Sequence, residues 1–359
     1  MNKVIGGGVK KTFAEFTGMK KLRLWIFIFV GAGIVAATPI RFLARTSTPQ
    51  ASSGPSAVVR VIVSADGTAD FPTIQRAVDH APLEGNGRLE IAIRPGTYHE
   101  RVKIPQDRPR VSLIGLGNDP SAVVITYSMS AAAAGGTFFS SVVEVQSEGF
   151  QAANLTIQNS FGPGSQAVAL TVYSDRAIVH DVRLLGWQDT LYAAAGRQYY
   201  KNCYIEGAVD FIFGDAQAVF ENSEIRSVGD GYIAAESRKA SDGTQGFVFN
   251  KCKLTQGLAQ GATPAKLDRG VFLGRPWRPY SRAVYLDCWM DKHIRVEGWD
   301  NWSDPANEKT AWFAEYNSTG PGANVAARAA WAHQLTEKDV AAFQTQKFLA
   351  GADGWNPAK

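Results

Sequence analysis

The 359-residue chain contains only three cysteines, Cys203, Cys252 and Cys288. An odd and sparse set of cysteines excludes the disulfide-dense scaffold of a small secreted domain. No pair of cysteines or histidines has zinc-ligand spacing, so we expect neither a metal site nor a cofactor. The motifs Gly-x-Ser-x-Gly, His-Glu-x-x-His and Gly-x-x-x-x-Gly-Lys are also absent, which removes the commonest signatures of serine hydrolases, zinc proteases and nucleotide enzymes.

The formal net charge of +4 comes from the N-terminal residues, and the rest of the chain has no excess of positive charge. Residues 1–45 hold eight basic side chains and one acidic one, so the remaining 314 residues carry 29 basic and 32 acidic side chains. A nucleic-acid-binding domain is usually basic, and the composition therefore argues against a nucleic-acid partner. The apolar content of 45% is ordinary for a globular protein and too high for a disordered one.

The N-terminal residues have the composition of an export signal. A basic stretch precedes an uncharged run from Leu24 to Ile40, and small residues follow. This order predicts export, with residues 1–45 acting as a signal or, if they are not cleaved, as a membrane anchor. Residues 46–57 have linker composition. We therefore expect the folded body to span 58–359 and to be periplasmic or secreted.

Only two segments of this body have helical periodicity. Thr73–Ala81 carries apolar residues on one face of a helix, and Thr336–Phe343 begins with a capping residue and has Asp339 at the capping-box position. The rest is rich in β-forming residues that are interrupted by Gly, Asn and Asp. These features predict an all-β fold with short terminal helices.

A four-residue pattern recurs in the β-rich part: a polar residue, a small or apolar one, any residue, and an apolar one. It begins at Asn154, Asp181, Asn202, Asn222, Lys251 and Asp287. Since alternate strand residues face the same side, the second and fourth positions should each form an inward column, which buries the three cysteines. The pattern favours a parallel β-helix, whose coils bury their faces against one another. An antiparallel sandwich with tight hairpin turns is the competing fold.

Carboxylates are the remaining candidates for chemistry. Asp189, in segment 186–192, and Asp210, in segment 207–214, each lie eight residues after the start of their repeat. In coils of equal length they would stack on neighbouring strands roughly 5 Å apart. The pKa values of two carboxylates this close separate, so that one can attack while the other donates a proton. The same offset lands on Asp230, but the aromatic residues and Gln188 beside the first two aspartates favour their pairing.

The segments that contain these aspartates resemble the signature motifs of pectin methylesterases (pectinesterases). The resemblance covers about residues 60–356 and is carried in the family's order by Gln166-Ala-Val-Ala-Leu, residues 186–192, residues 207–214, Leu273-Gly-Arg-Pro-Trp277 and Glu297-Gly-Trp-Asp-Asn-Trp302. It implies a right-handed parallel β-helix that releases methanol from methylated polygalacturonate. It also implies a monomer whose only partners are pectin and water. The short segment before the body suggests a bacterial-type member.

Carried over residue by residue, the resemblance implies a role for each motif residue. Asp210 would attack the methyl-ester carbonyl, and Asp189 would protonate the departing methanol and then activate water. Gln166 and Gln188 would donate hydrogen bonds to the oxyanion. Arg275 would keep Asp210 ionised. Substrate contacts are expected from Gln166, Arg275 and the aromatic side chains of Trp277, Phe211 and Trp187.

One position departs from the family pattern. Val142 stands where the family usually has a hydroxyl residue, which puts a substrate hydrogen bond from that strand in doubt, although Ser140 and Ser141 are adjacent. Two other functions remain open at this stage. A polysaccharide lyase or hydrolase could use the same fold, and a non-catalytic adhesin would need only the repeat. Methanol release without chain cleavage and without added calcium would separate the esterase from a lyase.

Overall fold

The structure is a computed structural model that describes residues 57–82, 87–108, 110–257 and 267–359, all of which belong to one compact unit. The predicted export leader at 1–45 and all but the last residue of the predicted linker lie outside the described residues. In the part of the chain that is described, no helix is long and apolar enough to cross a membrane.

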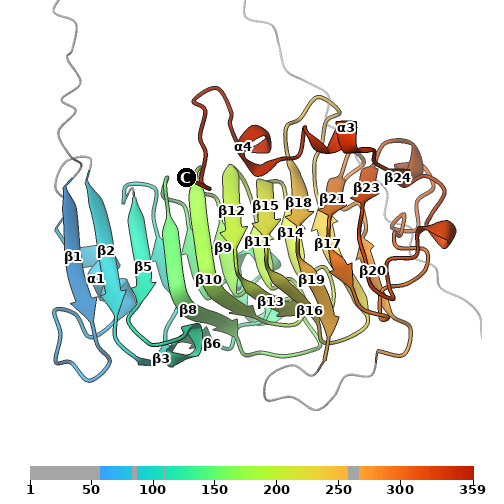
Figure 1. Ribbon diagram of the computed structural model, residues 1–359. Helices are drawn as coiled ribbons and strands as arrows, with labels where there is room; N and C mark the ends of the chain where they lie inside the picture. Colours follow the sequence, from blue (N-terminus) through green and yellow to red (C-terminus); the bar gives the residue numbers. More distant parts are fainter. Residues whose placement is uncertain (1–56, 83–86, 109, 258–266) are drawn as a thin grey trace, which may run out of the picture. The chain divides into compact units, whose positions relative to one another are not determined.

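Short strands wind through three ladders, in which each strand pairs with strands of the coils before and after it (Figure 1). The first ladder contains β1 (Val58–Val63), β2 (Arg88–Ile93), β5 (Val111–Gly115), the first parts of β8 (Gln151–Asn159) and β10 (Ala177–Leu185), β12 (Arg197–Lys201), β15 (Gln217–Glu221), β18 (Gly246–Asn250), β21 (Arg282–Leu286), β23 (Trp312–Tyr316) and β24 (His333–Gln334).

The other two ladders complete each coil. The second ladder contains β3 (Gly96–His99), β6 (Val123–Tyr127), the second parts of β8 and β10, β13 (Tyr204–Gly207), β16 (Glu224–Ser227), β19 (Lys253–Gln256) and β22 (Trp289–Met290). The third contains β4 (Val102–Ile104), β7 (Val143–Val145), β9 (Leu170–Val172), β11 (Leu191–Ala193), β14 (Ile212–Gly214), β17 (Gly231–Glu236) and β20 (Val271–Gly274). All strand pairs of the described residues are parallel. The fold is a parallel β-helix, as predicted, and not an antiparallel sandwich.

The polar residue that opens each repeat lies at the bend between the first and second ladders. Its backbone φ lies between 51° and 54° in all six repeats, at Asn154, Asp181, Asn202, Asn222, Lys251 and Asp287. Most residues are strained in this left-handed region, whereas Asn and Asp tolerate it because their short polar side chains can hydrogen-bond locally. The bend therefore explains why five of the six positions hold Asn or Asp.

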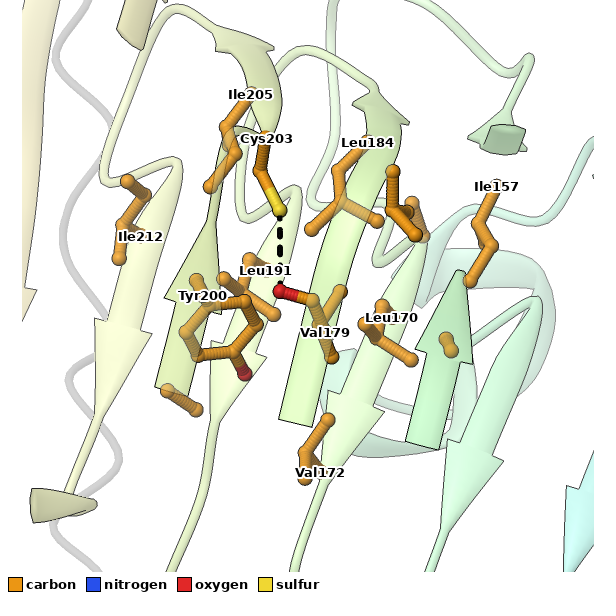
Figure 2. Packing of buried hydrophobic residues seen from close by; sticks show 14 of the residues in the cluster. Ile157, Leu170, Val172, Val179, Leu184, Leu191, Tyr200, Cys203, Ile205 and Ile212 are labelled. Carbon is orange, nitrogen blue, oxygen red and sulfur yellow. Dashed lines mark hydrogen bonds between the residues drawn. The ribbon is translucent and has the colours of Figure 1, made fainter. Parts of the chain in front are cut away.

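The second and fourth positions of the repeat form two columns in the core, and their twelve side chains are at most 2% exposed. All three cysteines lie in the first of these columns and are free thiols, as predicted. Figure 2 shows Cys203 among apolar neighbours, where its Sγ donates a hydrogen bond to the carbonyl oxygen of Val179 at 3.5 Å. A stack of aromatic rings fills the core beside the first ladder: Tyr200, Phe220, Phe249 and Tyr285, with centroids 4.4–4.8 Å apart.

Helices are short and lie outside the ladders. Helix α1 (Ile74–His80) lies within the predicted segment 73–81, and the side chain of Thr73 caps its N-terminus. Helix α3 (Glu337–Val340) has the predicted capping box but ends before Phe343, whose ring packs on Trp312 at 5.4 Å. The sequence analysis missed α2 and α4. The remaining helical segments are α2 (Ala131–Ala134), α4 (Thr345–Phe348), η1 (Pro120–Ala122), η2 (Thr137–Phe139), η3 (Asn307–Lys309) and η4 (Val325–Ala327).

Candidate active site

Two buried carboxylates come from the turns that lead into adjacent strands of the third ladder. Leu191 of β11 pairs with Ile212 of β14, so Asp189 and Asp210 occupy equivalent places two residues before each strand. The backbone N–H of Asp189 donates to the carbonyl of Val209 at 3.1 Å. Both aspartates have a left-handed backbone (φ 66° and 49°), and they are only 8% and 7% exposed. The register thus places both carboxylates in one cleft.

Asp230, which has the same offset in its repeat, is not part of this pair. Ile212 of β14 pairs with Ala234 of β17, which sets Tyr232 rather than Asp230 beside Asp210. The carboxylate of Asp230 instead accepts hydrogen bonds from the backbone N–H groups of Arg269 and Gly270. The structure therefore resolves an ambiguity that the repeat alone could not.

The cleft has a volume of about 300 Å³ and brings together six of the eight predicted site residues. Two of these six are the aspartates, two are glutamines, and the others are Arg275 and Trp277. Its complete lining is Thr137, Phe138, Gln166, Gln188, Asp189, Asp210, Phe213, Ala235, Arg275, Trp277 and Trp302. Among the described residues, no group of three or more His, Cys, Asp or Glu is placed to hold a metal ion.

The guanidinium of Arg275 forms a bidentate pair with the carboxylate of Asp210. Its Nε donates to Oδ1 of Asp210 at 2.9 Å, and its Nη2 donates to Oδ2 at 2.6 Å. The guanidinium carbon lies 3.8 Å from the ring centroid of Tyr232 and 3.7 Å from that of Trp302. These two rings hold the planar group by cation–π contact, which restricts its orientation. Asp210 is therefore fixed by a preorganised, charge-assisted pair.

The two aspartates have different electrostatic surroundings. Burial raises the pKa of Asp210, but the hydrogen bonds and charge of Arg275 counteract this rise. Burial and then the charge of Asp210 raise the pKa of Asp189 well above its ordinary value, and Arg275 offsets only part of that effect. Burial would lower the pKa of Arg275, yet the pairing with Asp210 raises it, so the guanidinium stays charged. Arg275 thus favours the ionised form of Asp210, whereas burial beside that charge favours the protonated form of Asp189.

The two glutamines stand side by side at the edge of the same cleft. Gln166 and Gln188 form an isolated parallel bridge, and the N–H of Ala167 donates to the carbonyl of Gln188 at 3.0 Å. Both side chains are half-buried, and their amides form no hydrogen bond with another described residue. Both side-chain amides are thus available to donate hydrogen bonds to a substrate oxygen beside the aspartates.

Aromatic side chains form one wall of the cleft, but Phe211 is not among them. Its side chain is 0% exposed and belongs to the interior core, so the prediction that it contacts the substrate is wrong. Asp210 turns the chain, and regular alternation begins only at Ile212, which faces inward. Phe213 therefore faces the cleft, where it stacks on Tyr192 at 4.6 Å and meets the edge of Trp277 at 5.9 Å.

Two further expectations also change. Trp187 is half-buried and is absent from the lining of the cleft among the described residues, so the structure gives no support for its contact with substrate. Val142 is fully buried in the core, and a hydroxyl at that position would not reach the cleft. The departure from the family pattern at Val142 therefore does not alter the lining of the cleft. The hydroxyl residue that lines the cleft is Thr137, in η2.

The sequence analysis assigned no role to several residues that build the site. Trp302 lay in a quoted motif, but its position over Arg275 depends on a left-handed backbone (φ 59°) and on its N–H, which donates to Oδ1 of Asp300 at 2.8 Å. Tyr232 lay in no quoted motif. Phe138 is brought over the third ladder by the α2–η2 insertion, and its ring lies 5.1 Å from Tyr192. No periodicity in the sequence signals these placements.

Comparison with known proteins identifies the family. Residues 60–352 match the family model described as Pectinesterase. Pectinesterase 31 of Arabidopsis thaliana is 38% identical over 300 residues, which cover 80% of this chain and 92% of that protein. Pectin methylesterase from carrot has a similar structure, with a TM-score of 0.76 and 32% identity over 82% of this chain and 93% of that one.

A third similar protein was solved with a bound sugar. It is a pectin methylesterase in complex with a hexasaccharide, with a TM-score of 0.68 and 30% identity over 83% of this chain and 98% of that one. The sequence relative and the carrot structure are plant proteins, so the narrower expectation of a bacterial-type member has no support. The chain belongs to the pectinesterase family of carboxylic ester hydrolases.

Proposed function

We propose that Asp210 is the nucleophile and Asp189 the acid and base in the hydrolysis of pectin methyl esters by this protein. The observation that carries the proposal is the unequal environment of two carboxylates in one cleft. Asp210 is paired with a charged arginine, and the pKa of Asp189 is raised well above its usual range. One group is thus suited to attack and the other to donate a proton.

The reaction has two steps. In the first, a carboxylate oxygen of Asp210 attacks the ester carbonyl carbon, and the amides of Gln166 and Gln188 stabilise the oxyanion. Asp189 gives its proton to the methoxy oxygen, the C–O bond breaks, and methanol leaves an acyl-enzyme. In the second step, Asp189 takes a proton from water while the water oxygen attacks the acyl carbon. Asp210 is released, and the product is a galacturonate carboxyl group.

Pectin, a methylated polygalacturonate, is the proposed substrate. The aromatic wall of Phe138, Tyr192, Phe213 and Trp277 offers apolar faces of the kind that pack against sugar rings. A hexasaccharide is bound in one solved relative, which supports a polymeric ligand for this cleft. We further propose that the protein acts as an exported monomer with a catalytic body at 58–359. The basic and apolar leader at 1–45 supports export, as a signal or as an anchor.

Replacing either aspartate by asparagine tests the assigned roles. Asp210→Asn should abolish methanol release from highly methylated pectin, because an amide cannot form the acyl-enzyme. Asp189→Asn should reduce the rate by roughly 10²- to 10⁴-fold through the loss of acid and base catalysis. Methanol and polymer length are followed in the same sample, with circular dichroism as the control for folding. Full turnover by Asp210→Asn would show that Asp210 is not the nucleophile. Shortening of the polymer by the unaltered protein would favour a lyase or hydrolase instead.

The pH dependence of kcat/KM should be bell-shaped. Activity should rise as Asp210 loses its proton and fall at higher pH as Asp189 loses its own, because the raised pKa of Asp189 lies above that of Asp210. Arg275→Lys keeps the charge but loses the planar fork. It should move the acidic limb upward by about one pH unit, the equivalent of one lost charge-assisted hydrogen bond. An unchanged acidic limb would show that Arg275 does not set the ionisation of Asp210.

Because Phe213 lines the cleft and Phe211 is buried in the core, their alanine variants should show different defects. Phe213→Ala should raise KM or lower kcat/KM, because the ring lines the cleft, and should also lower the free energy of unfolding, because the ring is only 4% exposed. Phe211→Ala removes a fully buried ring and should lower the free energy of unfolding by about 3–5 kcal/mol. Steady-state kinetics and urea denaturation of both variants measure this difference. A larger loss of kcat/KM in the folded Phe211→Ala variant than in Phe213→Ala would return Phe211 to the substrate cleft.

A further inference from the structure

A second hollow lies outside the catalytic cleft and carries a strong positive charge. Its volume is about 390 Å³, and it lies between the loop after β17, the start of β21, η3, the start of β23 and the segment that follows α3. Three of the side chains that line it are cationic: Arg238, Arg282 and Lys309. The others are hydroxyl or aromatic residues, and none is acidic. We call these residues the basic pocket.

The two guanidinium groups of the basic pocket are held by backbone carbonyls rather than by ion pairs with carboxylates. Arg238 donates from Nε to the carbonyl of Tyr280 at 2.6 Å and from Nη1 to the carbonyl of Gly243 at 3.0 Å. Arg282 donates to the carbonyls of Thr244 and Gln245. Backbone carbonyls orient these guanidinium groups without cancelling their charge. Within the described ranges, none of the three cations forms an ion pair.

Glu236 lies beneath the pocket, but its carboxylate is used by the backbone. Its two oxygens accept hydrogen bonds from the N–H groups of Arg238 at 3.1 Å and Arg282 at 2.6 Å. Burial raises the pKa of Glu236 to about 8. Even when it is ionised, this one carboxylate is outnumbered by the three cations of the basic pocket. Burial and the nearby charge of Arg238 lower the pKa of Arg282 to about 10. The two guanidinium groups therefore repel each other, and a bound anion would relieve that repulsion.

The same two chain segments build the catalytic cleft and the basic pocket. The N–H of Trp277 donates to the carbonyl of Glu236 at 3.1 Å, and the N–H of Tyr280 donates to the carbonyl of Arg238 at 3.3 Å. Trp277 lines the cleft, whereas Tyr280 and Arg238 line the pocket. Between them stands the exposed Arg278, whose guanidinium carbon lies 5.2 Å from a ring of Trp277. Arg278 thus places one exposed positive charge between the residues that line the cleft and those that line the pocket.

We propose that the basic pocket binds the carboxylates of de-esterified galacturonate units of the polymer that is hydrolysed in the cleft. The inference rests on the proposed function, because hydrolysis turns a neutral methyl ester into an anion. A methylated unit has no charge for these cations to attract, whereas a hydrolysed unit does. The pocket therefore holds the stretch of polymer that has already reacted, and the protein prefers partly de-esterified pectin.

The test measures binding of an unesterified oligogalacturonate of about ten units by calorimetry. Lys309→Glu should weaken this affinity roughly tenfold, the effect of placing a like charge beside the ligand, and Lys309→Ala should weaken it less. Lys253→Glu is the matched control, because Lys253 is exposed on β19 and does not line the pocket. Its affinity should stay within about twofold of that of the unaltered protein. Equal losses in Lys309→Glu and Lys253→Glu would overturn the proposal.

Two additional measurements separate the possible ligands and the possible failures. In Lys309→Glu, the ratio of kcat/KM on partly de-esterified pectin to kcat/KM on fully methylated pectin should fall. If Lys309→Glu weakens the binding of sulfate but not of oligogalacturonate, the pocket is a site for small inorganic anions and the proposal fails. The binding experiment needs no turnover. A lack of methanol release would therefore overturn the proposed function alone, and unchanged oligogalacturonate affinity would overturn this inference alone.

Discussion

Two carboxyl groups on neighbouring strands cannot both be ionised in a buried cleft, and the chemistry of this protein depends on which of them keeps the proton. Strand spacing alone would leave Asp189 and Asp210 equivalent, sharing one proton between them. Arg275 removes the equivalence, because both of its donors go to Asp210. Tyr232 and Trp302 hold the guanidinium from its two faces. This asymmetry favours the proton on Asp189, which is the proposed donor to the leaving methoxy group.

The β-helix supports backbone conformations that would be unfavourable elsewhere. Both aspartates lie in the left-handed region, which costs of order 1–3 kcal/mol for a residue other than glycine. The strands that follow the two aspartates, β11 and β14, are paired in the third ladder. Strand β14 ends at Gly214, where any Cβ would collide with the carbonyl oxygen of Ala193. Close coil-to-coil contact at this glycine keeps β11 and β14 in register. The stacked core thus offsets the strain that aims the two carboxylates into the cleft.

The architecture could be predicted because one repeat encodes it locally. The polar residue at each bend and the two buried columns behind it follow from a left-handed turn and strand alternation, and both are visible in the sequence. The pairing of Asp189 with Asp210 followed from equal coil lengths, whereas Asp230 could be excluded only with the actual register to β17.

The errors about the site residues concern the direction of side chains near turns. Phe211 and Phe213 are two residues apart and would share a face in a regular strand, but the turn at Asp210 sends Phe211 inward. Val142 lies in the core for a similar reason, just before β7 begins. Trp302 reaches Arg275 through its own left-handed backbone. The alternation of side chains holds only within strands. It therefore could not predict the side chains on turns and insertions that complete this cleft.

The change of charge during the reaction connects the cleft with the rest of the surface. The ester that enters is neutral, and the walls that receive it are aromatic and amide groups. The product is a carboxylate held beside the carboxylate of Asp210, so like-charge repulsion favours its departure. In the proposed binding mode, the cations of the basic pocket hold these new carboxylates, so the polymer stays on the protein after a unit has reacted.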